Sequence, residues 1–421
     1  MTGSGPELQR RLGTVDAVII GLGSMIGAGV FAVFAPAAAI AGSGLLIGLA
    51  IASVVAYANA TSSAQLAATY PSAGGTYVYG RERLGPWWGF LAGWGFVVGK
   101  TASVAAMAMT FAASVVPAAW QRPIAGLAII TLSAVNYRGI TRTALLTRVI
   151  VVVVLGVLAL VVAFGAVTVT DRGGVLDSWA ICDGGVGAVL QSSGLIFFAF
   201  AGYARLATLG EEVRNPARTI PRAIVVALLL VVLIYAAVAI TVLNVLGASG
   251  TASSSAPVVD AAAVAGGDGL AIVARVGASA ASLGALLALV AGVGRTGLAM
   301  ARGGDLPRWL AAVHPKHHTP HHADLALAVA ATAVVLLVDL RGAIAFSSFG
   351  VLVYYLIANV SALTQPAEQR RFPRAVAVLG AVGCVTLVVT LPVGAVLGGV
   401  LVFAVGIGYR LFRLAWGRMA G

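Results

Sequence analysis

The sequence predicts an all-α integral membrane protein with 12 transmembrane helices, and three observations support this fold class. The 421 residues are 60% hydrophobic and 10% charged, with a mean hydropathy of +1.00, whereas soluble proteins carry about 25% charged residues. The apolar residues form stretches of about 20, the length needed to span a bilayer core. Lys and Arg gather in alternate loops, as is typical of membrane proteins. Any function therefore has to lie within the membrane helices.

The apolar stretches leave only short connections between them, so the chain has no room for a separate soluble domain. The predicted membrane helices are residues 14–41, 44–69, 86–115, 122–138, 145–169, 187–209, 221–247, 270–301, 323–339, 342–363, 374–391 and 393–414. The first stretch is too long for the core of a signal peptide, which has about 7–15 residues. It should remain as the first membrane helix, after a short tail at residues 1–13.

The basic residues predict which way the helices run. If the helices alternate in direction, about 20 of the 26 Lys and Arg residues fall on the side of the N-terminus. Because positively charged loops remain in the cytoplasm, we expect a multi-pass protein of the plasma membrane with both termini cytoplasmic. The net charge of +12 then reflects topology and contact with membrane lipids, and it predicts no nucleic-acid partner.

The reactive side chains do not form a catalytic site in the sequence. Cys182 is predicted in a loop and Cys384 within a late helix, so their different depths disfavour a disulfide. The spans contain no phosphate-binding loop, no set of metal ligands and no nucleophile that can be paired with a base. The sequence therefore predicts no enzyme activity, no catalytic residue, no metal and no cofactor.

Clusters of small residues interrupt two of the predicted helices at mid-depth. The first helix holds four glycines between residues 21 and 29, and the sixth holds the pair Ala201-Gly202. Because the sixth helix follows five spans after the first, the two enter the membrane in opposite directions, a pattern typical of inverted repeats. An interrupted backbone leaves N–H and C=O groups for a polar ligand. The alternative interpretation is that these glycines only permit close helix packing.

Five short motifs lie at the predicted breaks and helix ends. They are GSMIGAGVF at residues 23–31, YPSAGGTY at 70–77, FAFAG at 198–202, EEVRNP at 211–216 and AMARGGDLP at 299–307. Together they resemble the amino acid–polyamine–organocation (APC) superfamily over roughly residues 12–365. The resemblance implies a 5+5 inverted repeat with broken helices 1 and 6, the repeats spanning 14–169 and 187–363, and two peripheral helices within 374–414.

The resemblance also implies that an α-amino acid binds between helices one and six. Its carboxylate would accept hydrogen bonds from backbone N–H groups of Gly27, Ala28 and Gly29, because a helix N-terminus carries partial positive charge. Its ammonium would donate to backbone carbonyls beside the two breaks. The remaining predicted substrate-binding residues are Ser24, Met25, Phe198, Ala199, Ala201 and Gly202. The ring of Phe198 is assigned to a lid over the substrate.

The sequence departs from the family pattern at three places. Proton-coupled members often carry a lysine in helix five, but the matching position is Val154. Members selective for cationic amino acids often have a carboxylate just after the helix-six break, where this chain has Ala204 followed by Arg205. A neutral substrate is therefore predicted. Ser279 and Ser282 in helix eight keep sodium coupling open, although they do not fall convincingly where the family pattern would place them.

Lys100 is the candidate for proton coupling. Only two of the 26 basic residues are lysines, and Lys100 lies mid-way along the third predicted span. A lysine can lose its proton when desolvated, whereas an arginine effectively cannot, and ionisable groups inside the membrane are commonly functional. The competing interpretation is a structural lysine that bonds carbonyls or a neighbouring helix end.

Two polar loops have local interpretations. The five histidines lie between residues 314 and 322, where contact with lipid headgroups is favoured over a metal site. The charged residues from Glu211 to Arg222 are interpreted as a network that closes the inner gate, or else as a solvated loop.

The sequence thus predicts a secondary transporter that moves an α-amino acid across the plasma membrane by alternating access, with H⁺ coupling as one option. The alternatives are an exchanger or facilitator without ion coupling, and a transporter-like sensor that binds its ligand without flux. A channel is disfavoured because no span presents a regular stripe of polar residues.

Overall fold

The computed structural model describes residues 12–70, 74–138, 143–168, 184–207 and 213–419, and over these residues the chain is helical without a β-strand. Ten helices are long and apolar enough to cross a membrane. Two shorter apolar helices, α13 (His321–Leu337) and α15 (Arg374–Thr390), complete the set. The predicted all-helical membrane fold is confirmed, whereas the division into 12 spans and two inverted repeats stays a prediction.

The helices follow the predicted spans closely. Their bounds are α1 Thr14–Met25, α2 Gly29–Ala32, α3 Phe34–Ala41, α4 Leu45–Thr69, α5 Thr76–Leu84, α6 Pro86–Val115, α7 Ala118–Tyr137, α8 Thr143–Val167, α9 Gly185–Phe200, α10 Ala204–Ala207, α11 Pro216–Ser253, α12 Pro257–Arg302, α13 His321–Leu337, α14 Leu340–Leu363, α15 Arg374–Thr390 and α16 Val393–Met419. Helix α6 starts with a proline at its first position after Gly85, which has a φ of 103°, an arrangement that favours a defined helix start.

Three helical segments were not expected from the sequence. Helix α5 was not predicted at all. Helix α11 continues to Ser253 instead of residue 247, and α12 begins at Pro257 instead of residue 270. Gly247 and Gly267 have φ angles of 72° and 69° within these two helices, a conformation that glycine adopts without steric cost. Each long helix therefore bends at its glycine, so that short helical segments join α11 to α12.

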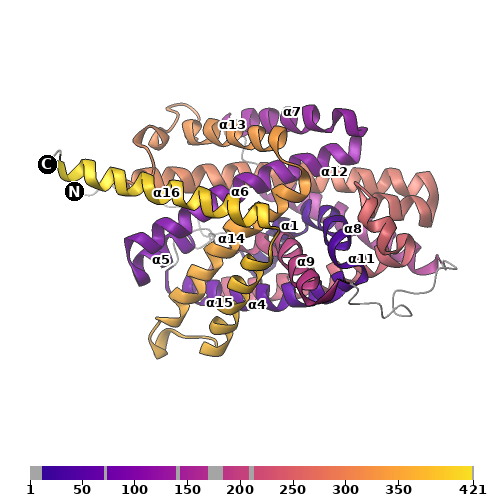
Figure 1. The fold of residues 1–421 in the computed structure, drawn as a ribbon, viewed down its shortest axis with the longest axis horizontal. Helices are drawn as coiled ribbons and strands as arrows, with labels where there is room; N and C mark the ends of the chain where they lie inside the picture. Colours follow the sequence, from indigo (N-terminus) through magenta and orange to yellow (C-terminus); the bar gives the residue numbers. More distant parts are fainter. Residues whose placement is uncertain (1–11, 71–73, 139–142, 169–183, 208–212, 420–421) are drawn as a thin grey trace.

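Small residues allow the central helices to approach closely. Figure 1 shows α7 beside α13 along one edge and α4 beside α15 along the opposite edge, with α6 and α12 between them. A Cβ atom added to Gly99 of α6 would lie 3.0 Å from the carbonyl oxygen of Ser347 in α14. Close backbone contact of this kind is what holds membrane helices together, because lipid offers no hydrophobic driving force between them.

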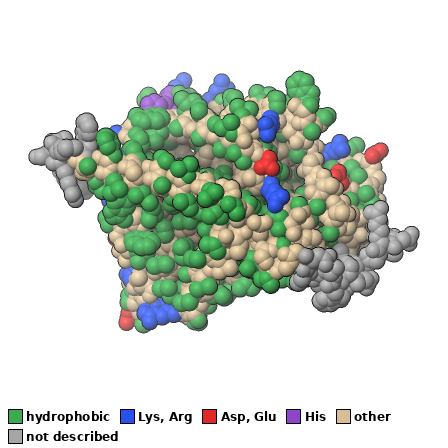
Figure 2. Space-filling model, in the orientation of Figure 1, with side chains coloured by type: hydrophobic (Ala, Val, Ile, Leu, Met, Phe, Trp, Pro, Cys, Tyr) green, Lys and Arg blue, Asp and Glu red, His purple; other side chains and the backbone are tan. Residues whose placement is uncertain are grey.

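The outer surface is suited to lipid. Hydrophobic side chains cover most of the face shown in Figure 2. Large apolar residues on three outer helices are strongly exposed, among them Leu233 of α11 at 67%, Val389 of α15 at 65% and Leu397 of α16 at 64%. In water such continuous exposure would promote association, so the surface agrees with a membrane-embedded protein.

The last helix, which the resemblance assigns to the periphery, makes polar contacts with the rest of the chain. The guanidinium of Arg410 in α16 donates a 2.6 Å hydrogen bond to the buried carboxylate of Asp305. The hydroxyl of Tyr77 in α5 donates to the same carboxylate over 2.9 Å. Arg413 donates to the carbonyls of Gly304 and Leu306. These bonds join α16 to the chain that follows α12, within one of the motifs that the sequence singled out.

Candidate functional site

The first predicted break is present in the structure. Helix α1 ends at Met25 and α2 begins at Gly29. The first backbone bonds after the break run from Phe31 and Ala32 to the carbonyl of Ala28, each over 3.0 Å. Ile26 still donates to the Leu22 carbonyl over 2.7 Å, so the N–H groups of Gly27 and Ala28 fall between this bond and the first bonds of α2.

The second break is present as well, and it touches the first. Helix α9 ends at Phe200, a 3₁₀ turn follows at Ala201–Tyr203, and α10 continues from Ala204. A Cβ atom on Gly202 would overlap the carbonyl oxygen of Ser24. A Cβ atom on Gly29 would lie 2.8 Å from the Cα of Ala199. Close packing therefore requires both glycines, whatever else they do.

A cavity of about 700 Å³ opens beside the two breaks, and we refer to it as the central cavity. Its wall includes eight of the ten predicted site residues: Ser24, Met25, Gly29, Lys100, Phe198, Ala199, Ala201 and Gly202. Gly27 and Ala28 are not part of the wall. Gly27 packs against Ala285, where an added Cβ would lie 2.7 Å from the alanine methyl, and Ala28 is fully buried.

Several carbonyls that were assigned to a substrate ammonium already accept hydrogen bonds within the chain. The hydroxyl of Tyr235 in α11 lies 2.5 Å from the Met25 carbonyl oxygen and 3.0 Å from that of Ala199. The Nζ of Lys100 donates to the Ala201 carbonyl over 3.1 Å. The hydroxyl of Tyr355 reaches the same Ala201 oxygen over 3.3 Å. Tyr235 of α11 thus links the two breaks, whereas Lys100 of α6 and Tyr355 of α14 contact the second break alone.

Sequence reasoning missed both tyrosines. They are fully buried, and their hydroxyl groups find partners in the broken backbone, as buried tyrosines generally do. The available signal was the presence of tyrosine within two predicted spans, Tyr235 in one and the adjacent Tyr354 and Tyr355 in the other. That signal was insufficient, because the sequence contains ten tyrosines and does not say which of them faces a break.

The cavity wall is positively charged. Lys100 is 5% exposed, and Arg205 of α10 and Arg295 of α12 line the same cavity. Among the described residues, no Asp or Glu belongs to this wall. Arg295 lies ten residues after Ala285, which is about 15 Å along a helix, and its side chain is exposed. The cavity therefore extends from the breaks toward the end of α12.

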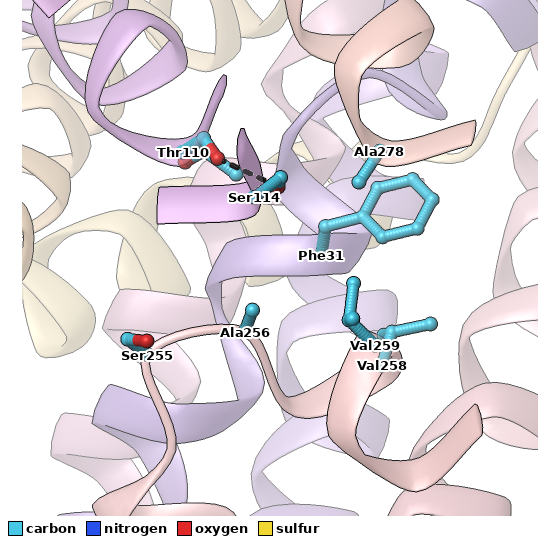
Figure 3. Close-up of a pocket in the computed structure, with 8 residues that line it drawn as sticks. All are labelled: Phe31, Thr110, Ser114, Ser255, Ala256, Val258, Val259 and Ala278. Atoms are coloured by element: carbon cyan, nitrogen blue, oxygen red, sulfur yellow. Dashed lines mark hydrogen bonds between the residues drawn. The ribbon is translucent and has the colours of Figure 1, made fainter. Parts of the chain in front are cut away.

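The opposite side of the first break is packed. Phe31 of α2 is 3% exposed, and Figure 3 shows its ring beside Ala278 of α12 and above Val258 and Val259. Thr110 and Ser114, near the end of α6, lie close by, with the Ser114 hydroxyl donating to the Thr110 carbonyl over 2.9 Å. We refer to this group of side chains as the Phe31 layer, which lines only a shallow hollow.

The remaining predicted positions have mixed outcomes. Val154 is 1% exposed in α8, so an apolar side chain occupies the position where the family pattern has lysine. Ser279 and Ser282 do not line the central cavity, although the Ser282 hydroxyl is buried without a hydrogen-bond partner among the described residues. Cys182 and the acidic pair at 211–212 lie outside the described residues.

The histidine-rich loop is an aromatic cluster. The rings of His314, His317 and His321 surround Tyr137 at centroid distances of 5.2–6.1 Å. Within the described part of the chain, no group of three His, Cys, Asp or Glu side chains is arranged to hold a metal. The histidine rings of this loop therefore pack against the end of α7.

The chain is similar in sequence to several known transport proteins. A family model described as amino acid permease matches residues 12–409. An uncharacterized transporter of Mycobacterium tuberculosis (strain H37Rv) is 56% identical over 405 residues, which cover 95% of this chain and 90% of that protein. The branched-chain amino acid permease of Bacillus subtilis is 26% identical, covering 88% of this chain and 83% of the relative. The vacuolar cationic amino acid transporter 4 of Arabidopsis thaliana is 26% identical over 85% of this chain and 63% of its own length.

Proposed function

The chain belongs to the amino acid permease family, and from this premise we propose that it carries an α-amino acid across the plasma membrane by alternating access. The observation that supports this most directly is the central cavity beside the meeting point of two broken helices. A cavity of this size accommodates a small organic molecule. The family is one of transporters, so we assign no enzymatic step to the chain.

The substrate would bind at the wall formed by the two breaks. Its carboxylate would lie at the start of α2 beside Gly29, the one residue of the Gly27–Gly29 segment that lines the cavity, where N–H groups precede the first helical hydrogen bonds. Its ammonium would compete with Lys100 and Tyr235 for the carbonyls of Ala201, Met25 and Ala199. Phe198 lines the cavity and would cover the bound molecule.

The substrate is proposed to lack a positively charged side chain. The position after the second break is Ala204 followed by Arg205, and both line the cavity. A basic side chain would therefore meet like charge. The relative named for branched-chain amino acids agrees with the neutral substrate that the sequence predicts, whereas the relative named for cationic amino acids is the competing precedent.

The topology and repeat boundaries are part of the proposal. We propose that residues 14–169 and 187–363 form two inverted repeats, that 374–414 are peripheral, and that both termini are cytoplasmic. In this orientation the central cavity faces the cytoplasm and the Phe31 layer faces outward. Single-cysteine labelling from each side of intact cells tests the orientation.

Proton coupling is proposed to run through Lys100. Its ammonium contacts a carbonyl of the second break, so a change in its protonation changes the hydrogen bonds of the substrate site. The other charged or titratable side chains around the cavity are Tyr77, Arg205 and Arg295, and Tyr355 shares the Ala201 carbonyl. No carboxylate of the described residues lines the cavity, which leaves Lys100 as the buried group best placed to exchange a proton.

Counterflow uptake tests the transport function. Purified protein in proteoliposomes preloaded with an unlabelled amino acid mixture should accumulate the labelled substrate, and liposomes without protein should not. Stabilisation by a ligand without accumulation would favour the sensor alternative. Absence of both uptake and stabilisation, over all proteinogenic amino acids, would contradict the proposal.

An imposed pH gradient tests the coupling. Lys100→Arg keeps the charge and Lys100→Met removes it, and both should abolish proton-driven accumulation while some exchange survives. If both variants accumulate substrate with the parent's pH response, Lys100 is structural. The chain would then be an exchanger, a facilitator or a transporter coupled through another group.

A further inference from the structure

The ammonium of Lys100 has unused hydrogen-bonding capacity at the central cavity. An ammonium has three N–H donors, and among the described residues the single bond that Lys100 makes is the one to the Ala201 carbonyl. Its side chain is 95% buried and lines the cavity. A buried ammonium without a counter-charge is unfavourable. A carboxylate on the bound molecule would supply both the charge and the acceptor.

Arg295 is a second cation of the cavity wall, nearer the end of α12, and unlike Lys100 it is exposed. Among the described residues it forms no hydrogen bond or ion pair, and it lines the cavity with its side chain exposed. The carboxylate of Asp324 acts on it electrostatically. That carboxylate is 98% buried on α13, bonds to Asn136 over 2.9 Å, and is not part of the cavity wall. Asp324 therefore lies near Arg295 but forms no ion pair with it among the described residues.

Basic groups thus extend along the cavity from the breaks to the end of α12. Arg205 also lines the wall, and it takes part in an interaction within the chain, so the inference rests on Lys100 and Arg295. A recess lined by charge of one sign raises the local concentration of the opposite ion. Anions are favoured along this path, and cations are repelled.

A neutral amino acid matches this wall incompletely. It brings one carboxylate and one ammonium, and the ammonium enters a site where Lys100 and Tyr235 already occupy carbonyls. A second carboxylate would balance one of the unpaired cations. We infer that the preferred substrate is an acidic amino acid, such as glutamate or aspartate. This inference rests on the proposed function and adds the substrate class to it.

Competition within matched pairs tests the inference. Glutamate and glutamine differ by little except one charge, as do aspartate and asparagine. In proteoliposomes, the acid should inhibit counterflow at a concentration at least about tenfold lower than its amide, since hydrogen bonds to charged groups are stronger than neutral ones. Lysine, added at the same concentrations, should be the weakest competitor.

Substitutions of Arg295 and Lys100 test which cationic side chain favours the acid over its amide. Arg295→Gln and Lys100→Met should each lower the ratio between acid and amide, and Arg295→Lys should retain most of it. Arg341→Gln is the matched control, because it removes a charge from an exposed residue at the start of α14, outside the cavity wall. Where a variant does not transport, thermal stabilisation of the purified protein by glutamate and by glutamine gives the same ratio.

The outcomes separate this inference from the proposed function. If glutamine or another neutral amino acid competes as well as glutamate, or if lysine competes best, the acidic preference is wrong while amino acid transport stands. An unchanged ratio in both Arg295→Gln and Lys100→Met would also overturn it. If no amino acid is bound or transported, the proposed function fails and the inference fails with it.

Discussion

The two sides of the first helix break are built from the same helices but have opposite character. On one side, α6 and α12 contribute Lys100, Ala288 and Arg295 to a cavity of about 700 Å³. On the other side, the same two helices contribute Thr110 and Ala278 to the packed Phe31 layer. The chain therefore has a cavity on one side of the break and packed side chains on the other. The proposed alternating access would require these two conditions to exchange.

The two sides differ in the side chains that lie along α12. Along α12 the open side presents Ala285, Ala288 and Gly292, which leave space between the helices. On the packed side a single aromatic ring, that of Phe31, fills the corresponding space against Ala278. Phe31 is therefore the largest side chain of the packed side.

The largest effect is expected from substitution of Gly202, where the two broken helices contact each other. Gly202→Ala would place a methyl group on the Ser24 carbonyl, so the two breaks could no longer touch. We expect destabilisation of more than about 4 kcal/mol, as for severe clashes with backbone, and loss of monodisperse protein in size-exclusion chromatography. Gly408→Ala is the control, since nothing lies within 4 Å of that added methyl. Normal yield and profile for Gly202→Ala would show that the breaks can separate without loss of the fold.

Gly29→Val is less informative than the sequence alone suggests. A valine there would block the proposed carboxylate position, but it would also press on the backbone of Ala199. Loss of binding could then reflect either change, so the variant requires a parallel measurement of thermal stability.

Truncating the Phe31 ring should open the packed side. Phe31→Ala removes a buried ring, a change that costs about 3–5 kcal/mol in soluble cores, so the melting temperature should fall. In a background without the two native cysteines, Ser114→Cys should react slowly with a membrane-impermeant maleimide, and adding Phe31→Ala should speed the reaction several-fold. Ala288→Cys, on the cavity side, should react quickly in both backgrounds. Equal labelling of Ser114→Cys with and without the ring would show that Phe31 does not close this side.

Removal of the Tyr235 hydroxyl should have a moderate effect. Tyr235→Phe leaves the carbonyls of Met25 and Ala199 without their shared donor, which costs about 1–3 kcal/mol for a buried polar group. We expect a lower melting temperature, measured by intrinsic tryptophan fluorescence, together with slower uptake. Tyr57→Phe on the outer face of α4, where the side chain is 40% exposed, should leave both unchanged. An unaltered Tyr235→Phe protein would mean that water or substrate readily replaces the hydroxyl.

The smallest effect is expected at the end of the open side. Arg148 of α8 and Asp16 of α1 form an ion pair of 2.5 Å, with side chains 46% and 29% exposed. Exposed pairs contribute up to about 1 kcal/mol and weaken with salt. Asp16→Asn should therefore lower the melting temperature only slightly, and the difference from the parent should shrink further in high salt. A large, salt-independent loss would instead indicate that this pair holds the open state.

Much of the fold could be predicted from the composition and from the pattern of apolar residues along the chain. Apolar stretches predicted helices whose bounds agree closely with the structure, as for residues 86–115 and α6 (Pro86–Val115), because a span must satisfy its own backbone within a bilayer. Clusters of small residues located both breaks, four glycines in the first helix and Ala201-Gly202 in the sixth. Helix α5 was missed because its residues are mostly polar, and the bends at Gly247 and Gly267 were missed because glycine in a helix does not reveal its φ angle.

By itself, the sequence determined that the chain is a helical membrane protein, where its helices are interrupted, and that an ionisable Lys100 lies inside a span. Tertiary structure alone decided what those residues contact. Lys100 meets Ala201 across 101 positions of sequence and Tyr235 meets Met25 across 210, and Arg295 joins the same cavity from α12. The residue pattern along one helix indicates which face is apolar. The partner of a polar group, however, depends on how helices distant in sequence pack together. The charge of the cavity, and hence the proposed substrate class, emerged only from that packing.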